Sequence, residues 1–189
     1  MLTCEERFVR AQKILRGMGL LDCLETIGEP HVIGSCRMDM MAWNDLDIDV
    51  ENSAMTREKL YALTAWVLET FRPTWYEANE EITDEGKTVW FHGFEATIDG
   101  EKWNFDLWFF DRETIEKAEA YCDRVAAAAD AVPGARDAIV TIKQELIARG
   151  RYGFDDYASM DVYRAVLEQG IRTTDELLAR YVKRENRID

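Results

Sequence analysis

Proline is scarce in this chain, and cysteine and histidine are few. Three prolines among 189 residues, with no low-complexity stretch, leave little room for a flexible linker. The four cysteines form no C-x-x-C pair, and the two histidines are poorly spaced from them. A zinc site is therefore not expected. The pattern predicts free thiols in a reducing cytoplasm.

Long apolar runs and an excess of basic residues are also missing. No stretch approaches the ~18–20 residues that cross a bilayer, and the opening MLTCEERFVR holds no apolar signal core. We therefore expect a cytoplasmic protein without a membrane partner. Lys and Arg total 23 against 37 Asp and Glu, a net charge of −14. That charge argues against a nucleic-acid partner and favours a small cationic ligand, a divalent metal or a basic protein.

Hydrophobic residues make up 47% of the chain, enough for a packed core, and their periodicity predicts an α+β fold. The first half predicts a mixed set of elements: a helix over 4–18, strands over 31–33 and 46–50, a helix over 56–71, and strands over 74–78, 87–98 and 102–110. The second half predicts helices only: 112–130, 136–149, 159–169 and 174–185. The composition changes near Asp111, so we expect domains over 1–111 and 112–189.

An acidic strand is the most informative segment. Residues 46–50 alternate between apolar and acidic, which places Asp45, Asp47 and Asp49 on one face. Residues two apart on a strand lie roughly 6.6 Å from each other, so these carboxylates repel. A solvated strand tolerates the repulsion, whereas a half-buried one requires a cation, for which Mg²⁺ is the natural candidate. Alternation alone leaves both interpretations open.

Two other segments add to this pattern. Gly34-Ser35 follows a short apolar strand, where a glycine lets backbone amides approach a phosphate and a serine adds a hydroxyl donor. Asp106 interrupts an aromatic strand, Trp103–Trp108, where a charge is costly unless it is paired or solvated. If this strand lies beside residues 46–50, Asp106 completes a cluster of three carboxylates. Such a cluster can hold two metal ions about 4 Å apart for phosphoryl displacement.

These elements together resemble a known signature. Ile33-Gly34-Ser35, nine intervening residues, and Asp45-Leu46-Asp47-Ile48 are similar to the motif of the nucleotidyltransferases related to DNA polymerase beta. Within that superfamily the chain looks most like the small lincosamide and aminoglycoside nucleotidyltransferases, which also carry an Asp soon after the glycine turn, as Asp39 does here. The resemblance covers roughly residues 28–110.

The resemblance implies roles for particular residues. Asp45 and Asp47 would be Mg²⁺ ligands, and Asp106 a third ligand or the base that takes a proton from the acceptor. Gly34 and Ser35 would contact the triphosphate of an NTP, with ATP as the expected nucleotide. Residues 1–111 would form the catalytic domain.

Some features leave choices open. The spacer before Asp45 is short and lacks the basic segment of the antibiotic enzymes, and Asp49 fits the motif with a longer spacer. Arg37 could reach a phosphate, pair with Asp39, or simply be solvated. Lys143 could clamp a triphosphate, or be solvated.

The resulting hypothesis is an Mg²⁺-dependent enzyme that moves a nucleoside monophosphate from an NTP to a hydroxyl of a small molecule. A cationic acceptor such as an aminoglycoside would suit the acidic residues of segment 77–85, if they lined the cleft. The alternatives are a protein-modifying nucleotidyltransferase, acting as a toxin or regulator, and a non-catalytic nucleotide-binding module of the same fold.

Overall fold

The computed structural model describes residues 2–181 and divides the chain into two compact units. The first unit ends at Asp123 and the second begins at Arg124. This division falls within helix α5 (Arg112–Ala131), which begins where the sequence predicts a domain boundary. The first half of that helix therefore belongs to the unit that contains the sheet.

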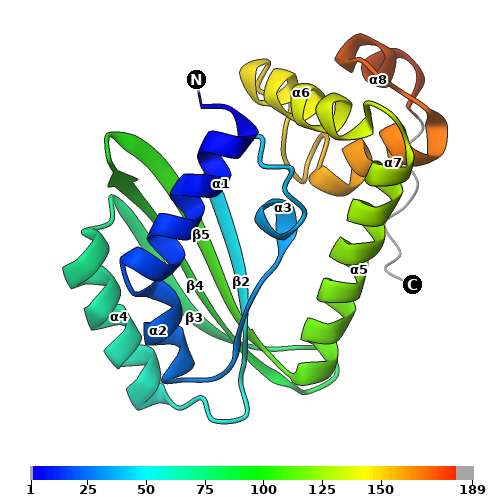
Figure 1. The fold of residues 1–189 in the computed structure, drawn as a ribbon. Helices are drawn as coiled ribbons and strands as arrows, with labels where there is room; N and C mark the ends of the chain where they lie inside the picture. Colours follow the sequence, from blue (N-terminus) through cyan, green and yellow to red (C-terminus); the bar gives the residue numbers. More distant parts are fainter. Residues whose placement is uncertain (1, 182–189) are drawn as a thin grey trace. The chain divides into compact units, whose positions relative to one another are not determined.

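A mixed five-stranded sheet forms the centre of the first unit (Figure 1). Its strands are β1 (Pro30–Val32), β2 (Asp45–Glu51), β3 (Trp75–Ile82), β4 (Thr88–Ile98) and β5 (Glu101–Phe110). The spatial order is β1-β2-β5-β4-β3; β2 and β5 run parallel, and the other neighbours are antiparallel. The structure thus confirms the predicted α+β class.

Helices cover one face of the sheet (Figure 1). Three helical segments near the N-terminus and one helix further along the chain form this layer. These are α1 (Cys4–Gln12), a π-helical turn η1 (Lys13–Gly17), α2 (Leu20–Glu25) and α4 (Arg57–Phe71). Their apolar side chains pack against alternate residues of the central strands, among them Leu46, Ile48 and Phe105. Because strand side chains alternate between faces, the acidic residues of β2 are turned to the other face.

Local sequence signals account for several element boundaries. Thr3 and Glu6 form the predicted capping box of α1, with the Glu6 amide donating to Thr3 Oγ1 at 3.1 Å. Thr56 caps α4 as expected. Asp99 and Gly100 both have positive φ, 51° and 81°, as the two-residue turn between β4 and β5 requires.

Other boundaries differ from the expectation. The helix predicted over 4–18 continues as a π-helical turn after Gln12, and α2 follows without having been predicted. Gly34-Ser35 opens a four-residue helix, α3 (Gly34–Arg37), where only a tight turn was expected. Segments of four to six residues, such as these, are too short for hydrophobic periodicity to reveal a helix.

The second unit is helical, as predicted. It contains the end of α5 with α6 (Ala135–Ala148), α7 (Ser159–Gln169) and α8 (Thr174–Arg180), and α6 contacts both α7 and α8. Thr173 caps α8 by accepting from the Glu176 amide at 3.2 Å. The helix predicted over 174–185 ends at Arg180, and residues 182–185 lie outside the described part of the chain.

The cysteines and the helix lengths add two facts. All four cysteines are free thiols. Between residues 2 and 181, no helix combines the length and the apolar character needed to cross a membrane.

Candidate active site

Three carboxylates converge on the face of the sheet opposite the helical core. Parallel pairing places Asp47 directly beside Asp106, and Asp45 beside Asn104. Asp45, Asp47 and Asp106 each offer an oxygen, and these oxygens all lie within 4.8 Å of one another. All three side chains are half-buried. The predicted approach of Asp106 to the acidic strand is therefore observed.

A hydrogen bond from Asn104 and partial burial both act on the carboxylates of the cluster. Asn104 Nδ2 donates to Asp45 Oδ1 at 2.9 Å, which orients that carboxylate. Burial raises the pKa of Asp106, and the nearby Asn104 amide partly opposes the shift. The cause of the raised pKa is that burial disfavours the charged form of a carboxyl group.

Gly34 lies against the cluster, where a larger residue has no room. Its φ is +63°, and a Cβ built on it would lie 2.1 Å from Asp47 Oδ2. The glycine thus lets the start of α3 approach the Asp47 carboxylate. The adjacent Ser35 is buried. The sequence motif and the carboxylates are consequently parts of one site.

Asp49 shares the face of the other two strand acids but takes no part in the cluster. It is 2% exposed, and its Oδ1 has no hydrogen-bond partner among residues 2–181. Burial, followed by the Glu119 carboxylate on α5, raises the pKa of Asp49 to about 7. The geometry thus groups Asp45, rather than Asp49, with Asp47 and Asp106.

Arg37 is engaged by α5. Its Nη1 donates to Glu119 at 2.7 Å, and its Nε donates to Asp123 at 2.9 Å. These partners differ from the Asp39 pairing considered from the sequence. With the Nη2 bond to Asp123, these contacts use three of the five N–H donors of the guanidinium. The phosphate-binding role of Arg37 stays a prediction.

Lys143 lies inside the second unit. It is 1% exposed, donates to the Tyr163 hydroxyl at 3.2 Å, and has its Nζ 5.0 Å from the centre of the Tyr163 ring. The expectation of a solvated lysine is wrong, because this helix position faces the packed interior. Its role as a triphosphate clamp stays a prediction.

The acidic segment and a buried histidine of the sheet take no part in the carboxylate cluster. The acidic segment Glu77–Glu85 lies on the edge strand β3 and in the turn after it, and β4 separates β3 from β5. Its five acids are exposed, as a solvated segment would be. His92 is fully buried in the sheet, and its Nδ1 forms a hydrogen bond with the Tyr76 hydroxyl at 3.0 Å, so it has a structural role.

Sequence reasoning missed the part of Asn104. Its parity with Asp106 on the aromatic strand was visible, but its contact with Asp45 depends on which strand lies beside β5. A polar residue two positions before the candidate acid was the available signal.

Comparison with known proteins identifies the class of fold. No protein-family model and no curated protein sequence matches the chain. The solved structure of the Cid1 poly(U) polymerase with Mg and 3′-dATP bound is 16% identical, with a TM-score of 0.56 over 85% of this chain. The structure of the non-canonical poly(A) polymerase complex GLD-2–GLD-3 is 13% identical, with a TM-score of 0.52 over 100% of this chain.

These likenesses show a shared fold. The chain has the nucleotidyltransferase fold: a mixed sheet flanked by helices and followed by a helical region. It matches 48% of the Cid1 chain and 67% of the GLD-2 chain, so it spans about half the length of the first of these enzymes.

Proposed function

We propose that this protein is an Mg²⁺-dependent nucleotidyltransferase that moves a nucleoside monophosphate from an NTP to a hydroxyl group. The observation that carries the proposal is the convergence of Asp45, Asp47 and Asp106 within 4.8 Å, next to Gly34. The nucleotidyltransferase fold supports the same activity. Three carboxylates this close repel one another, and a divalent cation bound among them would offset that repulsion.

The residues present fit a hard divalent cation. Carboxylate oxygens are the ligands that Mg²⁺ prefers, and it keeps further positions for water or phosphate oxygens. Asp45, Asp47 and Asp106 would hold the metal. Gly34 admits the ligand oxygen of Asp47 at a place that a Cβ would fill. When bound, Mg²⁺ would neutralise the charge that develops on the phosphate oxygens.

The chain's own residues account for the other requirements. Gly34 and Ser35 would contact the triphosphate through backbone amides and a hydroxyl. Asp106 would take the proton of the acceptor hydroxyl, whose oxygen then attacks the α-phosphorus. The bond from the α-phosphorus to the bridging oxygen breaks, and pyrophosphate leaves with both electrons of that bond.

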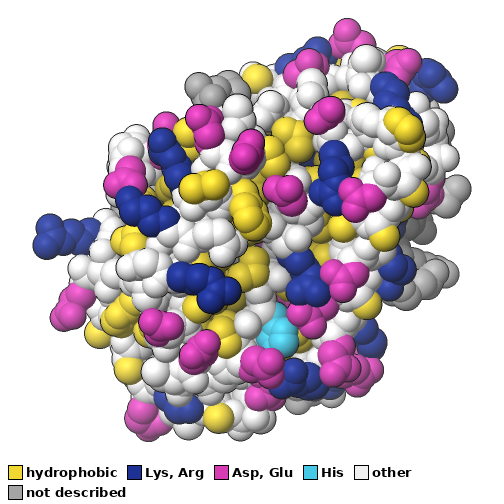
Figure 2. Space-filling view, in the orientation of Figure 1, with side chains coloured by type: hydrophobic (Ala, Val, Ile, Leu, Met, Phe, Trp, Pro, Cys, Tyr) yellow, Lys and Arg dark blue, Asp and Glu magenta, His cyan; other side chains and the backbone are white. Residues whose placement is uncertain are grey.

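A small molecule is the acceptor that charge favours. The chain carries a net charge of −14, and a backbone-binding surface for RNA needs a field of Lys and Arg. On the face shown in Figure 2, Lys and Arg side chains are interspersed with Asp and Glu. An antibiotic of the lincosamide or aminoglycoside class remains one candidate within this group.

The test is incubation of the purified protein with each NTP, labelled at the α-phosphate, and Mg²⁺. Aminoglycosides, lincosamides, lysate proteins and an RNA oligonucleotide serve as acceptors, and pyrophosphate release is measured in parallel. Transfer of label to a small molecule that disappears in Asp47→Asn, but not in the matched Asp49→Asn variant, supports the proposal.

Other outcomes overturn parts of it. If the label is found on protein or RNA, the acceptor is that macromolecule and not a small molecule. Nucleotide binding without pyrophosphate release across the panel indicates a binding module of the same fold. Full turnover in both Asp45→Asn and Asp47→Asn removes these residues from the chemistry.

A further inference from the structure

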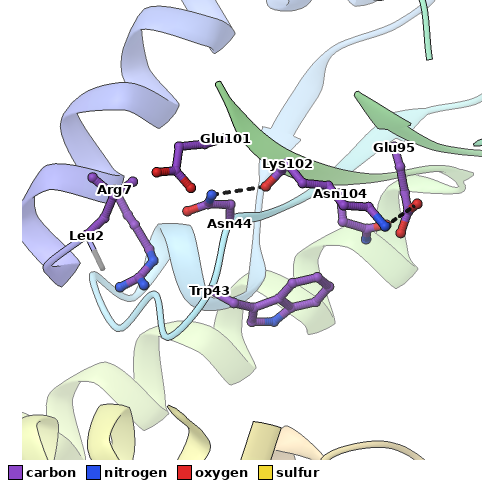
Figure 3. Close-up of a pocket in the computed structure, with 8 residues that line it drawn as sticks. All are labelled: Leu2, Arg7, Trp43, Asn44, Glu95, Glu101, Lys102 and Asn104. Atoms are coloured by element: carbon purple, nitrogen blue, oxygen red, sulfur yellow. Dashed lines mark hydrogen bonds and ion pairs between the residues drawn. The ribbon is translucent and has the colours of Figure 1, made fainter. Parts of the chain in front are cut away.

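A pocket of about 260 Å³, drawn with its lining residues in Figure 3, includes two neighbours of Asp45. Asn104 lines it and donates to Asp45 at 2.9 Å, and Asn44, the residue before Asp45, lines it too. The pocket therefore adjoins the proposed reaction centre through two asparagines.

One wall holds a buried cation that no carboxylate pairs with. Arg7 of α1 is 5% exposed, and no carboxylate of residues 2–181 forms an ion pair with it at 4.0 Å or less. Its Nη1 donates a long hydrogen bond of 3.5 Å to the Met41 carbonyl, and its Nε has no partner within the described chain. A buried guanidinium is costly unless an anion or several acceptors compensate it. An anionic ligand group would supply that compensation.

The other charged residues that line the pocket are Lys102, Glu95 and Glu101. Lys102 pairs with Glu95 at 2.6 Å. Glu101 lies near enough to Arg7 to raise its pKa, although burial has the larger, opposite effect. Arg7 is thus the cation that remains for a ligand.

Trp43 and Asn44 provide the remaining recognition groups. The Arg7 side chain extends from α1 toward the segment that carries these two residues (Figure 3). Trp43 is half-buried, and an indole face stacks on planar rings. Asn44 donates to the Lys102 carbonyl at 3.0 Å, while its own Oδ1 has no hydrogen-bond partner in residues 2–181.

The size of the pocket limits its occupant. Pockets that hold whole drug-sized ligands measure about 300–1,000 Å³. A volume of about 260 Å³ therefore suits one ring with one acidic substituent. A longer acceptor would extend out of it.

We propose that this pocket, the Arg7 pocket, selects the acceptor: a hydroxyl compound with a planar ring that bears a carboxylate or a phosphate. The acidic group would pair with Arg7, the ring would lie against Trp43, and the hydroxyl would face Asp106. The assignment rests on the proposed nucleotidyl transfer and adds the acceptor class to it. Within the small-molecule acceptors, this class takes the place of the cationic antibiotics, which the exposed acidic segment on β3 would suit instead.

The test compares acceptors that differ in the anion. Para-hydroxymethylbenzoate is paired with benzyl alcohol for the carboxylate, and meta-hydroxymethylphenyl phosphate is paired with benzyl alcohol for the phosphate. In the wild type, kcat/KM should favour the anionic member by about tenfold or more, since a charge-assisted hydrogen bond contributes about 1.5–3 kcal/mol. Which pair shows the larger preference distinguishes carboxylate from phosphate.

Two matched variants separate recognition from folding. Arg7→Gln should raise KM for the anionic acceptors by about tenfold and leave the neutral ones unchanged, and Arg7→Lys should restore part of the preference. Glu101→Gln removes the negative charge near Arg7, so it should lower KM for the same anions. If Arg7 had only a structural role, Arg7→Gln would change KM for neutral and anionic acceptors by the same factor.

A binding measurement keeps this inference apart from the proposed function. Calorimetric titration with benzoate and with phenyl phosphate, which lack an aliphatic hydroxyl, should detect binding to the wild type that Arg7→Gln weakens about tenfold. Such binding without turnover of any acceptor would retain the pocket and overturn the transfer reaction. If kcat/KM is equal for anionic and neutral acceptors, or if neither anion binds, the role of the Arg7 pocket is overturned. The proposed nucleotidyl transfer is then unaffected.

Discussion

Gly34 and Asp47 are packed so closely that a Cβ on Gly34 would lie 2.1 Å from Asp47 Oδ2. Gly34 also has a positive φ of +63°, which side-chain-bearing residues rarely adopt. The glycine is therefore required for two reasons, backbone conformation and space for a carboxylate.

Gly34→Ala should reduce Mg²⁺-dependent turnover by about a hundredfold, because displacement of a reacting group by about 1 Å has effects of that size. Gly86→Ala is the matched control, since Gly86 has a φ of +79° but no atom within 4 Å of a Cβ. Both variants carry the backbone strain of about 1–2 kcal/mol, measurable by urea unfolding. Equal turnover in the two variants would contradict the importance of the Asp47 contact.

Because the three carboxylates repel one another, we expect Mg²⁺ binding to raise the melting temperature of the protein. Removing one negative charge by Asp47→Asn or Asp106→Asn should stabilise the metal-free protein and abolish the increase in melting temperature on adding Mg²⁺ with NTP. The expected increase in the wild type corresponds to about 2.7 kcal/mol at a hundredfold excess over Kd. Asp49→Asn should keep the increase, because Asp49 lies outside the cluster. Loss of the Mg²⁺ response in Asp49→Asn alone would reverse the assignment.

Buried His92 predicts a dependence of stability on pH. Burial lowers the pKa of His92 from 6.5 to about 4, so the unfolded chain binds a proton at a pH where the folded chain does not. The stabilisation is therefore complete above about pH 6.5 and is lost as the pH falls toward 4. At about 1.4 kcal/mol per pKa unit, the loss attributable to this residue is on the order of 3 kcal/mol.

Urea unfolding of the wild type and His92→Gln at several pH values between 4.5 and 7.5 measures this term. The variant should be less stable at neutral pH, since it loses the bond to Tyr76, but its stability should change less with pH. Parallel pH profiles for the two proteins would assign the acid sensitivity to other groups.

Whether Lys143 contacts the triphosphate, as the sequence allows, can be tested by substitution. Lys143→Met keeps most of the buried volume and removes the charge, so the helical unit should stay folded. If Lys143 binds the triphosphate, KM for the NTP should rise by about tenfold or more. An unchanged KM in a protein with wild-type circular dichroism would show that this lysine serves packing against Tyr163.

Local patterns in the sequence determined much of the fold and the contents of the site. Alternation defined β2, the Thr3 and Thr56 caps located two helix starts, and Asp99-Gly100 predicted the β4–β5 turn. These features depend on residues near each other in the chain, so their physical cause is visible there. The motif around Gly34 and the acids of β2 could be recognised for the same reason.

The tertiary structure decided which of these residues act together. Period-two alternation puts Asp45 and Asp49 on the same face, at equal distances along the strand from Asp47, and cannot choose between them. The parallel pairing of β2 with β5 brings in Asp106, and α5 places Glu119 near Asp49. Arg7 meets Trp43 and Asn44 only because α1 lies beside the segment before β2. Contacts between distant segments depend on strand register and helix packing, which no short stretch of sequence encodes by itself.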